Sequence, residues 1–435
     1  MDILIKNGRI LNPALKEDII GDVLIKEGMV DSVGSNISCD AQVTIDASGC
    51  YVMPGFIDMH VHLRDPGQEY KETIRTGSNA AAHGGFTTIC PMPNTKPPTD
   101  TPEKVSDIIK RSKEESLINI LPVGSATLGM NGEEITDIAG MKAAGACGIS
   151  EDGKSVMNSS VCRKAMREAA KADIPVMAHC EDIDLVEGGV MNAGKRAEEL
   201  GLKGISNAVE DIIAARDMMI AGETGARLHL CHCSTKGSVK MLKVAKEDGR
   251  KVTAEACPHH FCLCDEDIPG NDANYKMNPP LRSREDMEAL REGLKDGTID
   301  VISTDHAPHS TEEKAGGFEK APFGIVGLET SAALTMTELV LKGYITPLQM
   351  AEKMSFNPAK ILGIDRGIIA EGKVADIVIF NPDDEYHIDI NTFESKGTNT
   401  PFNGKKVKGR VLYTICGGKI VYKYDGTENG GKNKK

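Results

Sequence analysis

Two histidines separated by a single residue, His60 and His62, offer the clearest chemistry in this sequence. They end the apolar run that begins at Phe56, and the two-residue period of a strand turns both side chains to the same side. Two imidazole rings placed in this way can bind one metal ion. Histidines on the surface, and buried histidines whose ring nitrogens are already hydrogen-bonded, often share this spacing. The pair therefore indicates a metal site only if further ligands lie nearby.

Four more candidate ligands end other apolar runs of the chain: Asp152, His179, His232 and Asp305. Most have a structural alternative. The two histidines also fit core residues whose ring N–H groups are hydrogen-bonded to carbonyls, and Asp152 fits a turn residue before Gly153. Asp305 follows apolar and small residues that would bury it, and a buried carboxylate needs a partner.

Together these side chains form a set of four imidazoles and two carboxylates, which suits Zn²⁺ with an open position for water. We expect two zinc ions, bridged by Asp152 and by a shared hydroxide, because bound metal lowers the pKa of water enough to generate a nucleophile near neutral pH. Asp305, both a ligand and a neighbour of that hydroxide, is expected to act as general acid/base. It would take a proton during attack and deliver it to the departing nitrogen.

The elements that must position these residues are parallel strands. Eight apolar runs alternate with helical stretches, which predicts an α/β fold with parallel strands joined by crossover helices, a (β/α)₈ TIM-type barrel. The carboxyl ends of such strands open on one face, where the active site lies. Helices are expected to begin at Thr101-Pro102 and at Asn207, which with Glu210 fits a capping box. The eight runs begin near Phe56, Phe86, Ile118, Cys147, Ile174, Leu228, Val252 and Val301.

The two ends of the chain have the rhythm of β-hairpins. Short apolar runs separated by Asn-Gly, Glu-Gly and Gly-Gly turns occur near both termini. We expect residues 1–52 and 366–424 to form one small β-sandwich domain beside a barrel domain of residues 53–365. The last segment, residues 425–435, is rich in Gly, Lys and Asn and is expected to be disordered, because it has almost nothing to bury.

The composition excludes several classes of protein. A net charge of −13 argues against binding to nucleic acid or to an anionic membrane, and no stretch approaches the ~20 apolar residues of a membrane-spanning helix. Residues 1–5 lead directly into strand-like sequence without the features of a signal peptide. The 12 cysteines follow no disulfide framework and are interpreted as reduced thiols. We therefore expect a cytoplasmic enzyme that acts on a small molecule.

The segments around the candidate ligands carry longer motifs. Residues 54–62 read PGFIDMHVH, and residues 303–309 read STDHAPH. The first resembles the strand-one motif of the amidohydrolase superfamily, and the second resembles the strand-eight segment of its long bacterial dihydroorotases. This resemblance covers nearly the whole chain. It implies reversible, zinc-dependent ring closure of N-carbamoyl-L-aspartate to L-dihydroorotate in pyrimidine biosynthesis, and a homodimer. The match continues at residues 62–67, 91–95, 277–282 and 321–324.

The resemblance also implies a role for each site residue. It places one zinc ion on His60, His62 and Asp152, the other on Asp152, His179 and His232, with Asp305 completing the site. A carboxylate of the substrate would be held by Arg64, Asn94 and His309, because a guanidinium group offers a bidentate fork. For Arg64 by itself, a surface salt bridge is the alternative. The full set of implied substrate contacts is His62, Arg64, Asn94, Asn278, His309, Phe323 and Gly324.

Other functions stay open at this point. Hydantoinases and allantoinases resemble the same motifs but bridge their metals with a carboxylated lysine where this chain offers Asp152. Lys154 lies two residues farther on and leaves that alternative open. An inactive scaffold protein would be marked by loss of metal ligands, and a metal-storage protein would have no need for Arg64.

The remaining cysteine and histidine pairs receive structural interpretations. Cys231 and Cys233 have a spacing of one, unlike the usual zinc knuckles, and are expected to face the helices. His259 and His260 are expected to form a loop pair. A glycine pair within residues 310–324 gives flexibility beside the site, so this segment is expected to close as a lid.

Overall fold

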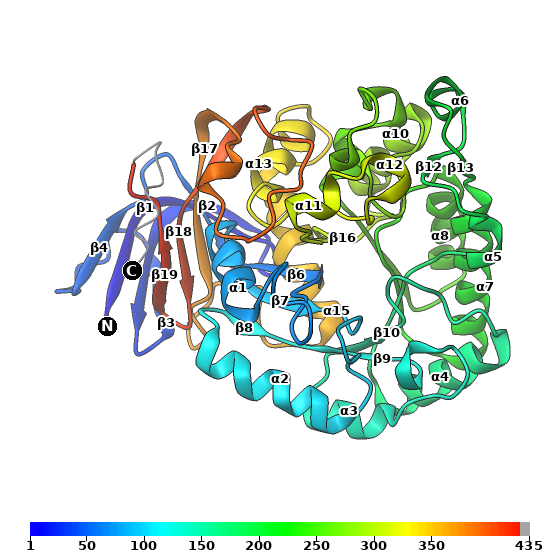
Figure 1. The fold of residues 1–435 in the computed structure, drawn as a ribbon. Coiled ribbons are helices and arrows are strands. Elements are labelled where there is room, and N and C mark those ends of the chain that lie inside the picture. The colour runs from blue at the N-terminus through cyan, green and yellow to red at the C-terminus, as the bar shows by residue number, and fades with distance from the viewer. Residues whose placement is uncertain (427–435) are drawn as a thin grey trace.

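A large β-sheet and a barrel lie side by side in the molecule (Figure 1). The computed structural model describes residues 1–426. The large sheet has 8 strands in the order β19-β18-β17-β5-β1-β2-β3, with β4 paired to β1. These strands are β1 (Ile3–Asn12), β2 (Glu17–Lys26), β3 (Met29–Gly34), β4 (Val43–Asp46), β5 (Tyr51–Pro54), β17 (Ile377–His387), β18 (Lys406–Cys416) and β19 (Lys419–Lys423).

Both ends of the chain build this sheet, as predicted for the β-sandwich. Strand β17 pairs antiparallel with β5, with Ile377 opposite Pro54, so the C-terminal strands add directly to the N-terminal ones. The sheet encloses an apolar core of its own, in which Ile5, Ile25 and Ile415 are fully buried. The predicted domain boundaries stay predictions, and the predicted disordered tail lies from residue 427 onward outside the described residues.

The barrel consists of parallel strands, and each of the eight predicted runs contains one of its strand positions. Short strands β8 and β9 together fill the third position. The barrel closes through a parallel bridge between Val61 and His306 and a hydrogen bond from the His62 N–H to the His306 carbonyl (2.8 Å). The predicted fold class is therefore confirmed. The strands are β6 (Phe56–Val61), β7 (Phe86–Pro91), β8 (Asn119–Ile120), β9 (Val123–Ser125), β10 (Gly148–Ser150), β11 (Val176–Ala178), β14 (Leu228–Leu230), β15 (Val252–Ala256) and β16 (Val301–Ile302).

Crossover helices surround the barrel (Figure 1). Thr101 caps the second helix as predicted, because its hydroxyl accepts from the Lys104 N–H (3.4 Å). The capping box at Asn207 was wrong: the Asn207 side chain donates to Asp286 instead (3.0 Å), and Glu210 binds Ser234. The longer helices are α1 (Ile74–His83), α2 (Pro102–Glu115), α3 (Ile138–Ala144), α4 (Ser159–Ala172), α7 (Ala208–Thr224), α8 (Lys236–Glu247) and α10 (Arg284–Asp296).

Shorter elements fill the loops and the last part of the barrel. No helix among residues 1–426 is long and apolar enough to cross a bilayer. These elements are η1 (Leu128–Met130), α5 (Ile183–Val186), β12 (Met191–Asn192), α6 (Lys195–Leu200), β13 (Gly204–Ile205), α9 (Pro258–Cys262), η2 (Asp265–Asp267), η3 (Ala273–Tyr275), α11 (Thr311–Lys314), α12 (Gly317–Lys320), α13 (Ser331–Thr335), η4 (Met336–Val340), α14 (Pro347–Ala351), η5 (Glu352–Phe356), α15 (Asn357–Leu362) and η6 (Ile390–Thr392).

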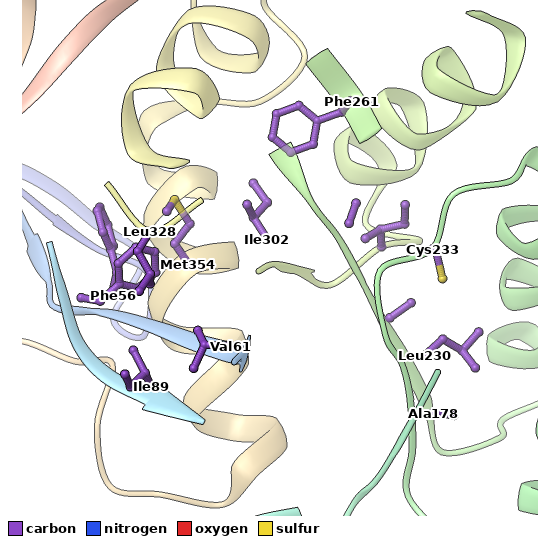
Figure 2. Close-up of a cluster of buried hydrophobic side chains, with 14 of the residues drawn as sticks. Phe56, Val61, Ile89, Ala178, Leu230, Cys233, Phe261, Ile302, Leu328 and Met354 are labelled. Carbon is purple, nitrogen blue, oxygen red and sulfur yellow. The ribbon is translucent and has the colours of Figure 1, made fainter. Parts of the chain in front are cut away.

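The main apolar core lies around the barrel strands (Figure 2). Phe56 and Phe86 begin neighbouring strands and meet edge to face, with ring centroids 5.7 Å apart. Farther round the barrel, Phe261, Ile302 and Leu230 belong to the same buried cluster. Burial of apolar side chains stabilises the fold by about 25 cal/mol for each Å² removed from water. The strand ends that carry the candidate ligands are therefore fixed by packing on a continuous core.

Candidate metal centre and active site

The first group of candidate ligands meets where β6 ends. The Nε2 atoms of His60 and His62 lie 3.6 and 3.1 Å from Asp305 Oδ1. The same two nitrogens lie 3.2 and 3.5 Å from the carboxylate of Asp152. All four side chains are buried. The four residues that were predicted at strand ends thus lie together, and their nitrogen and oxygen atoms form one compact group.

The second group lies on the other side of Asp152. His179 Nδ1 and His232 Nε2 are 2.9 Å apart, and each lies 3.6 Å from Asp152 Oδ1. Asp152 therefore faces both groups of histidines. The six predicted ligands come from strands 1, 4, 5, 6 and 8 of the barrel, and the structure brings all of them to one mouth.

Three residues at this mouth have a left-handed backbone conformation that is uncommon for residues other than glycine. The φ angles are +60° at Arg64, +32° at His232 and +49° at Asp305. Each follows the end of its strand by a few residues, where the chain turns sharply. Such strain costs on the order of 1–3 kcal/mol and often marks functional sites. At His232 the turn redirects the side chain, because alternation from His229 and Cys231, which lie beside Glu255, would aim residue 232 to the opposite side.

The unpartnered atoms of the group show that a cation fits it. His60 Nε2 and Asp152 Oδ1 are buried and have no hydrogen-bond partner among the described residues, although they lie 3.2 Å apart. Leaving such atoms unsatisfied costs roughly 1–3 kcal/mol each. Lone pairs of imidazole and carboxylate that converge in this way are the donors that zinc and similar ions bind. The residues present therefore fit a metal ion.

The electrostatics of the mouth favour ionised carboxylates. Burial alone would raise the pKa of Asp305, but the hydrogen bond with His62 and the nearby histidines lower it to about 2. Burial likewise opposes ionisation of Asp152, and His60, His179 and His232 hold its pKa well below the usual range. Both aspartates are thus available as anionic ligands at neutral pH.

Glu255, which was not predicted from the sequence, stands directly behind the candidate ligands. It lies inside β15, and its carboxylate accepts from His60 Nδ1 (2.8 Å), His229 Nε2 (3.0 Å) and the His232 N–H (3.1 Å). His229 continues the chain of contacts to Thr253 (2.9 Å). A carboxylate behind a ligating histidine fixes its tautomer and ring orientation. The signal available in the sequence was a charged residue, Glu255, within a short strand of otherwise uncharged residues.

Further buried groups hold the remaining ligands. Asp58 accepts from the N–H groups of His60 (3.0 Å) and Thr304 (3.2 Å), so it ties β6 to the segment that leads to Asp305. Burial raises the pKa of Asp58 to about 7 despite these bonds.

Two of the contacts link predicted ligands to predicted substrate residues. Asn94 joins His62 Nδ1 (3.0 Å) to the Asp152 carboxylate (3.2 Å). Glu181, which the sequence analysis also missed, contacts His179 Nε2 (3.2 Å) and accepts from the Asn278 amide (2.9 Å). The two asparagines therefore border the candidate metal ligands directly.

The other candidate substrate residues form a second group beside the first. The Arg64 guanidinium donates to the Pro308 carbonyl and contacts His309 Nε2, both at 3.3 Å. His309 Nε2 lies 2.8 Å from the Phe323 carbonyl. Gly324 follows with φ +126°, and a Cβ there would lie 2.7 Å from the Cβ of Ala307. This position therefore requires glycine.

Two smaller expectations were wrong. Cys231 does not face the helices: it packs with the barrel interior, within 4.8 Å of His60 and Glu255, on the same side as His229, which also contacts Glu255. Alternation therefore continues as far as Cys231, and His232, with φ +32°, is the residue that departs from it. His259 and His260 are not loop residues but are buried in α9. Lys154 donates to the Met130 carbonyl (3.3 Å), whereas Asp152 occupies the place among the histidines.

The segment expected to act as a lid is held by hydrogen bonds from a lysine side chain to backbone carbonyls. Lys314 donates to the carbonyls of Lys276 (3.2 Å), Pro322 (3.0 Å) and Gly324 (2.9 Å). Its closure stays a prediction.

Comparison with known proteins agrees with this architecture. Residues 51–421 match the model of the amidohydrolase family. Dihydroorotases from Bacillus cytotoxicus and from Bacillus cereus strain AH820 are each 48% identical over 422 residues, which is 97% of this chain and 98% of theirs. Among solved structures, L-hydantoinase from Arthrobacter aurescens has a TM-score of 0.87 at 28% identity, covering 97% of this chain and 96% of its own. Dihydropyrimidinase from Brevibacillus agri has a TM-score of 0.85 at 25% identity, covering 97% and 95%.

A barrel whose strand ends gather four histidines and two aspartates at one mouth has the form of a metal-dependent hydrolase. The matches in sequence and in structure extend over almost the whole chain. The chain belongs to the amidohydrolase family, and within it to the dihydroorotases.

Proposed function

We propose that this protein catalyses the reversible ring closure of N-carbamoyl-L-aspartate to L-dihydroorotate, the reaction for which its 48% identical relatives are named. Hydrolysis of the cyclic amide is the same reaction in reverse. The alternative, a hydantoinase or allantoinase activity, has less support, because the hydantoinase neighbours share only 28% identity or less.

One observation carries the choice of an anionic substrate. None of the ion pairs of residues 1–426 includes Arg64, whose guanidinium contacts a carbonyl and an imidazole beside the metal ligands. A partly buried cation without a carboxylate partner provides a site for an anion, and a guanidinium binds a carboxylate through two parallel hydrogen bonds. Dihydroorotate carries such a carboxylate, whereas the ring of hydantoin does not.

Asp305 is assigned the proton transfer. In hydrolysis, a water oxygen bonds to a ring carbonyl carbon, and the bond from that carbon to the ring nitrogen breaks. One proton moves from the water to the departing nitrogen. With a pKa of about 2, the Asp305 carboxylate is ionised and can accept this proton before passing it on. A bound metal would supply Lewis acidity and lower the pKa of water.

We further propose two zinc ions. His60, His62 and Asp305 would hold one ion, His179 and His232 the other, and Asp152 would bridge them. The distances of 3.2–3.6 Å from Asp152 to the histidines support this arrangement. Elemental analysis of the purified protein is expected to give two zinc ions per chain, and a single ion at full activity would contradict the bridging role.

The substrate is tested by comparing two rings that differ in their carboxylate. Wild-type protein is assayed on L-dihydroorotate and on dihydrouracil, the same ring without the carboxylate, together with Arg64→Gln. Loss of a charged hydrogen bond, about 1.5–3 kcal/mol, predicts a fall of about 10- to 150-fold in kcat/KM on dihydroorotate. The low activity expected on dihydrouracil should change little. Arg284→Gln, which breaks an exposed ion pair with Glu266, is the control and should leave both rates unchanged.

Two outcomes would redirect the proposal. Faster turnover of hydantoin or allantoin than of dihydroorotate by the wild type would favour the alternative function. An equal loss of kcat/KM on both rings in Arg64→Gln would show that Arg64 does not act through the substrate carboxylate.

The proposal includes two properties of the whole enzyme, a cytoplasmic location and a homodimeric state. The first follows from the interpretation of the cysteines as reduced thiols, and the second from the resemblance to dihydroorotases. Light scattering of the purified protein measures the second directly, with twice the chain mass of 46.6 kDa as the expected result.

A further inference from the structure

A buried lysine next to the proposed substrate site has no part in the proposed metal binding, proton transfer or substrate binding. Lys71 lies on the loop between β6 and α1 and is only 6% exposed. Its Nζ atom lies 3.2 Å from His309 Nδ1 and 2.9 Å from Glu313 Oε1. Burying an ammonium group is costly unless it is paired. The two contacts of Lys71 therefore indicate why a lysine is buried at this position.

Two contacts favour the same tautomer of His309, and Lys71 provides one of them. The Phe323 carbonyl can only accept a hydrogen bond, so it favours a proton on His309 Nε2, 2.8 Å away. In the neutral ring, Nδ1 then has a free lone pair, and it accepts from the Lys71 ammonium. Burial, together with the charges of Arg64, Lys71 and Lys314, lowers the pKa of His309 to about 3 and keeps the ring neutral.

This tautomer affects Arg64. Arg64 Nη2 lies 3.3 Å from His309 Nε2. Because that nitrogen carries a proton, it cannot accept from the guanidinium, and the Nη2 donors stay available for a ligand. In the opposite tautomer, Nε2 would accept from Arg64 and would release the Phe323 carbonyl. One proton on His309 thus decides whether the guanidinium fork is free.

The second contact of Lys71 shows that this lysine is not itself free to bind the anion. Its ammonium is paired with Glu313, which also accepts from the Tyr70 hydroxyl (3.0 Å). Arg64, in contrast, belongs to none of the ion pairs of residues 1–426. Arg64 and Lys71 therefore have different tasks beside His309.

We propose that Lys71 is a positioning residue of the substrate-carboxylate site: it donates to His309 Nδ1, holds the Nε2–H tautomer and so keeps the Arg64 guanidinium free for the substrate carboxylate. This inference rests on the proposed function only for the identity of that carboxylate. The tautomer itself is a property of the protein.

The test uses Lys71→Met, which keeps most of the apolar stem and removes the donor, in the metal-loaded protein. Nitrogen NMR of ¹⁵N-histidine-labelled protein reports the tautomer of His309, assigned with His309→Gln. We expect the Nε2–H form in the wild type and loss of that form in Lys71→Met. KM for dihydroorotate should rise by about tenfold or more, as for a lost charged hydrogen bond, with a much smaller change in kcat. Lys71→Arg, which keeps a donor, should restore most of the affinity.

Matched variants separate positioning from stability. Lys353→Met removes an equally buried lysine that donates to the Ile299 carbonyl (2.8 Å), away from His309. It should lower stability without changing KM or the His309 signals. If Lys71→Met leaves Glu313 unpaired and fails to fold, the double variant with Glu313→Gln removes the unpaired charge and serves in its place.

The outcomes distinguish this inference from the proposed function. An unchanged Nε2–H tautomer in Lys71→Met overturns the role of Lys71, whatever the substrate is. A changed tautomer with an unchanged KM for dihydroorotate overturns the link to the carboxylate. If the wild type does not hydrolyse dihydroorotate at all, the proposed function fails, and the tautomer measurement alone decides whether Lys71 positions His309.

Discussion

Replacing Glu255 by glutamine should weaken metal binding although Glu255 is not itself a proposed ligand. Its carboxylate accepts from His60 Nδ1 at 2.8 Å, from His229 Nε2 at 3.0 Å and from the His232 N–H at 3.1 Å. Glutamine keeps one oxygen and places an NH₂ group where the other oxygen accepted. One histidine N–H would then face a donor, and His60 would lose the anion that orients it.

The size of the effect follows from these contacts. Removing a partner behind a metal-ligating histidine typically weakens metal affinity about 10- to 100-fold, or about 1.4–2.7 kcal/mol. We expect a change of this size for Glu255→Gln, measured by competition with a chromogenic chelator. Thermal unfolding of the metal-free protein gives the separate cost in stability.

Glu210→Gln is the matched control. Glu210 is buried to a similar degree and accepts from the N–H groups of Ser234 (3.0 Å) and Thr235 (3.3 Å), but it contacts no histidine. It should lose stability and keep its metal affinity. If Glu255→Gln binds metal as tightly as the wild type and loses only as much stability as Glu210→Gln, Glu255 is a structural residue and the reasoning is wrong.

Three further predictions concern stability. Burial opposes ionisation of Glu313, but Lys71, the Ser310 N–H and Tyr70 lower its pKa from 4.5 to about 2. The ionised Glu313 therefore stabilises the folded protein fully above pH 4.5, and this stabilisation is lost as the pH falls toward 2. The loss in Glu313→Gln, measured by urea unfolding, should thus be constant from neutral pH down to pH 4.5 and shrink below it. A constant difference at lower pH would contradict the pairing. Gly67→Ala places a Cβ 1.9 Å from the Lys96 carbonyl oxygen at a residue with φ +97°. Gly49 also has a positive φ, but a Cβ there would meet no atom within 4 Å, so Gly49→Ala should lower the free energy of unfolding by only about 1–2 kcal/mol. The loss in Gly67→Ala should be several times larger. Phe86→Ala should cost about 3–5 kcal/mol in the same assay, and a loss below 1 kcal/mol would mean that the core collapses around the missing ring.

The strand-end ligands could be predicted because each depends on local information. His60 and His62 share a strand, and apolar runs end at or just before Asp152, His179 and Asp305. A parallel barrel brings the carboxyl ends of its strands to one face whatever the details of its packing. Local pattern and general topology were therefore sufficient for these residues.

Residues that act through long-range contacts could not be found in the same way. Glu255 reaches His60 across 195 positions of sequence, and Lys71 reaches His309 across 238. The orientation of Cys231 was predicted wrongly because His232 was assumed to continue the alternation of its strand, whereas the backbone turns at His232 with φ +32°. Local sequence patterns do not specify such contacts and turns.

The sequence by itself determined the alternation of strands and helices, the joining of the two chain ends in one sheet and the six candidate ligands, because these features follow from periodicity and from the ends of apolar runs. Only the tertiary structure decided which groups stand behind the candidate ligands, which tautomer of His309 is favoured, and that Arg64 forms no ion pair among residues 1–426. Those properties arise when barrel closure brings distant side chains to within hydrogen-bonding distance in a buried, poorly solvated mouth, where each polar atom must find a partner or remain available for a ligand.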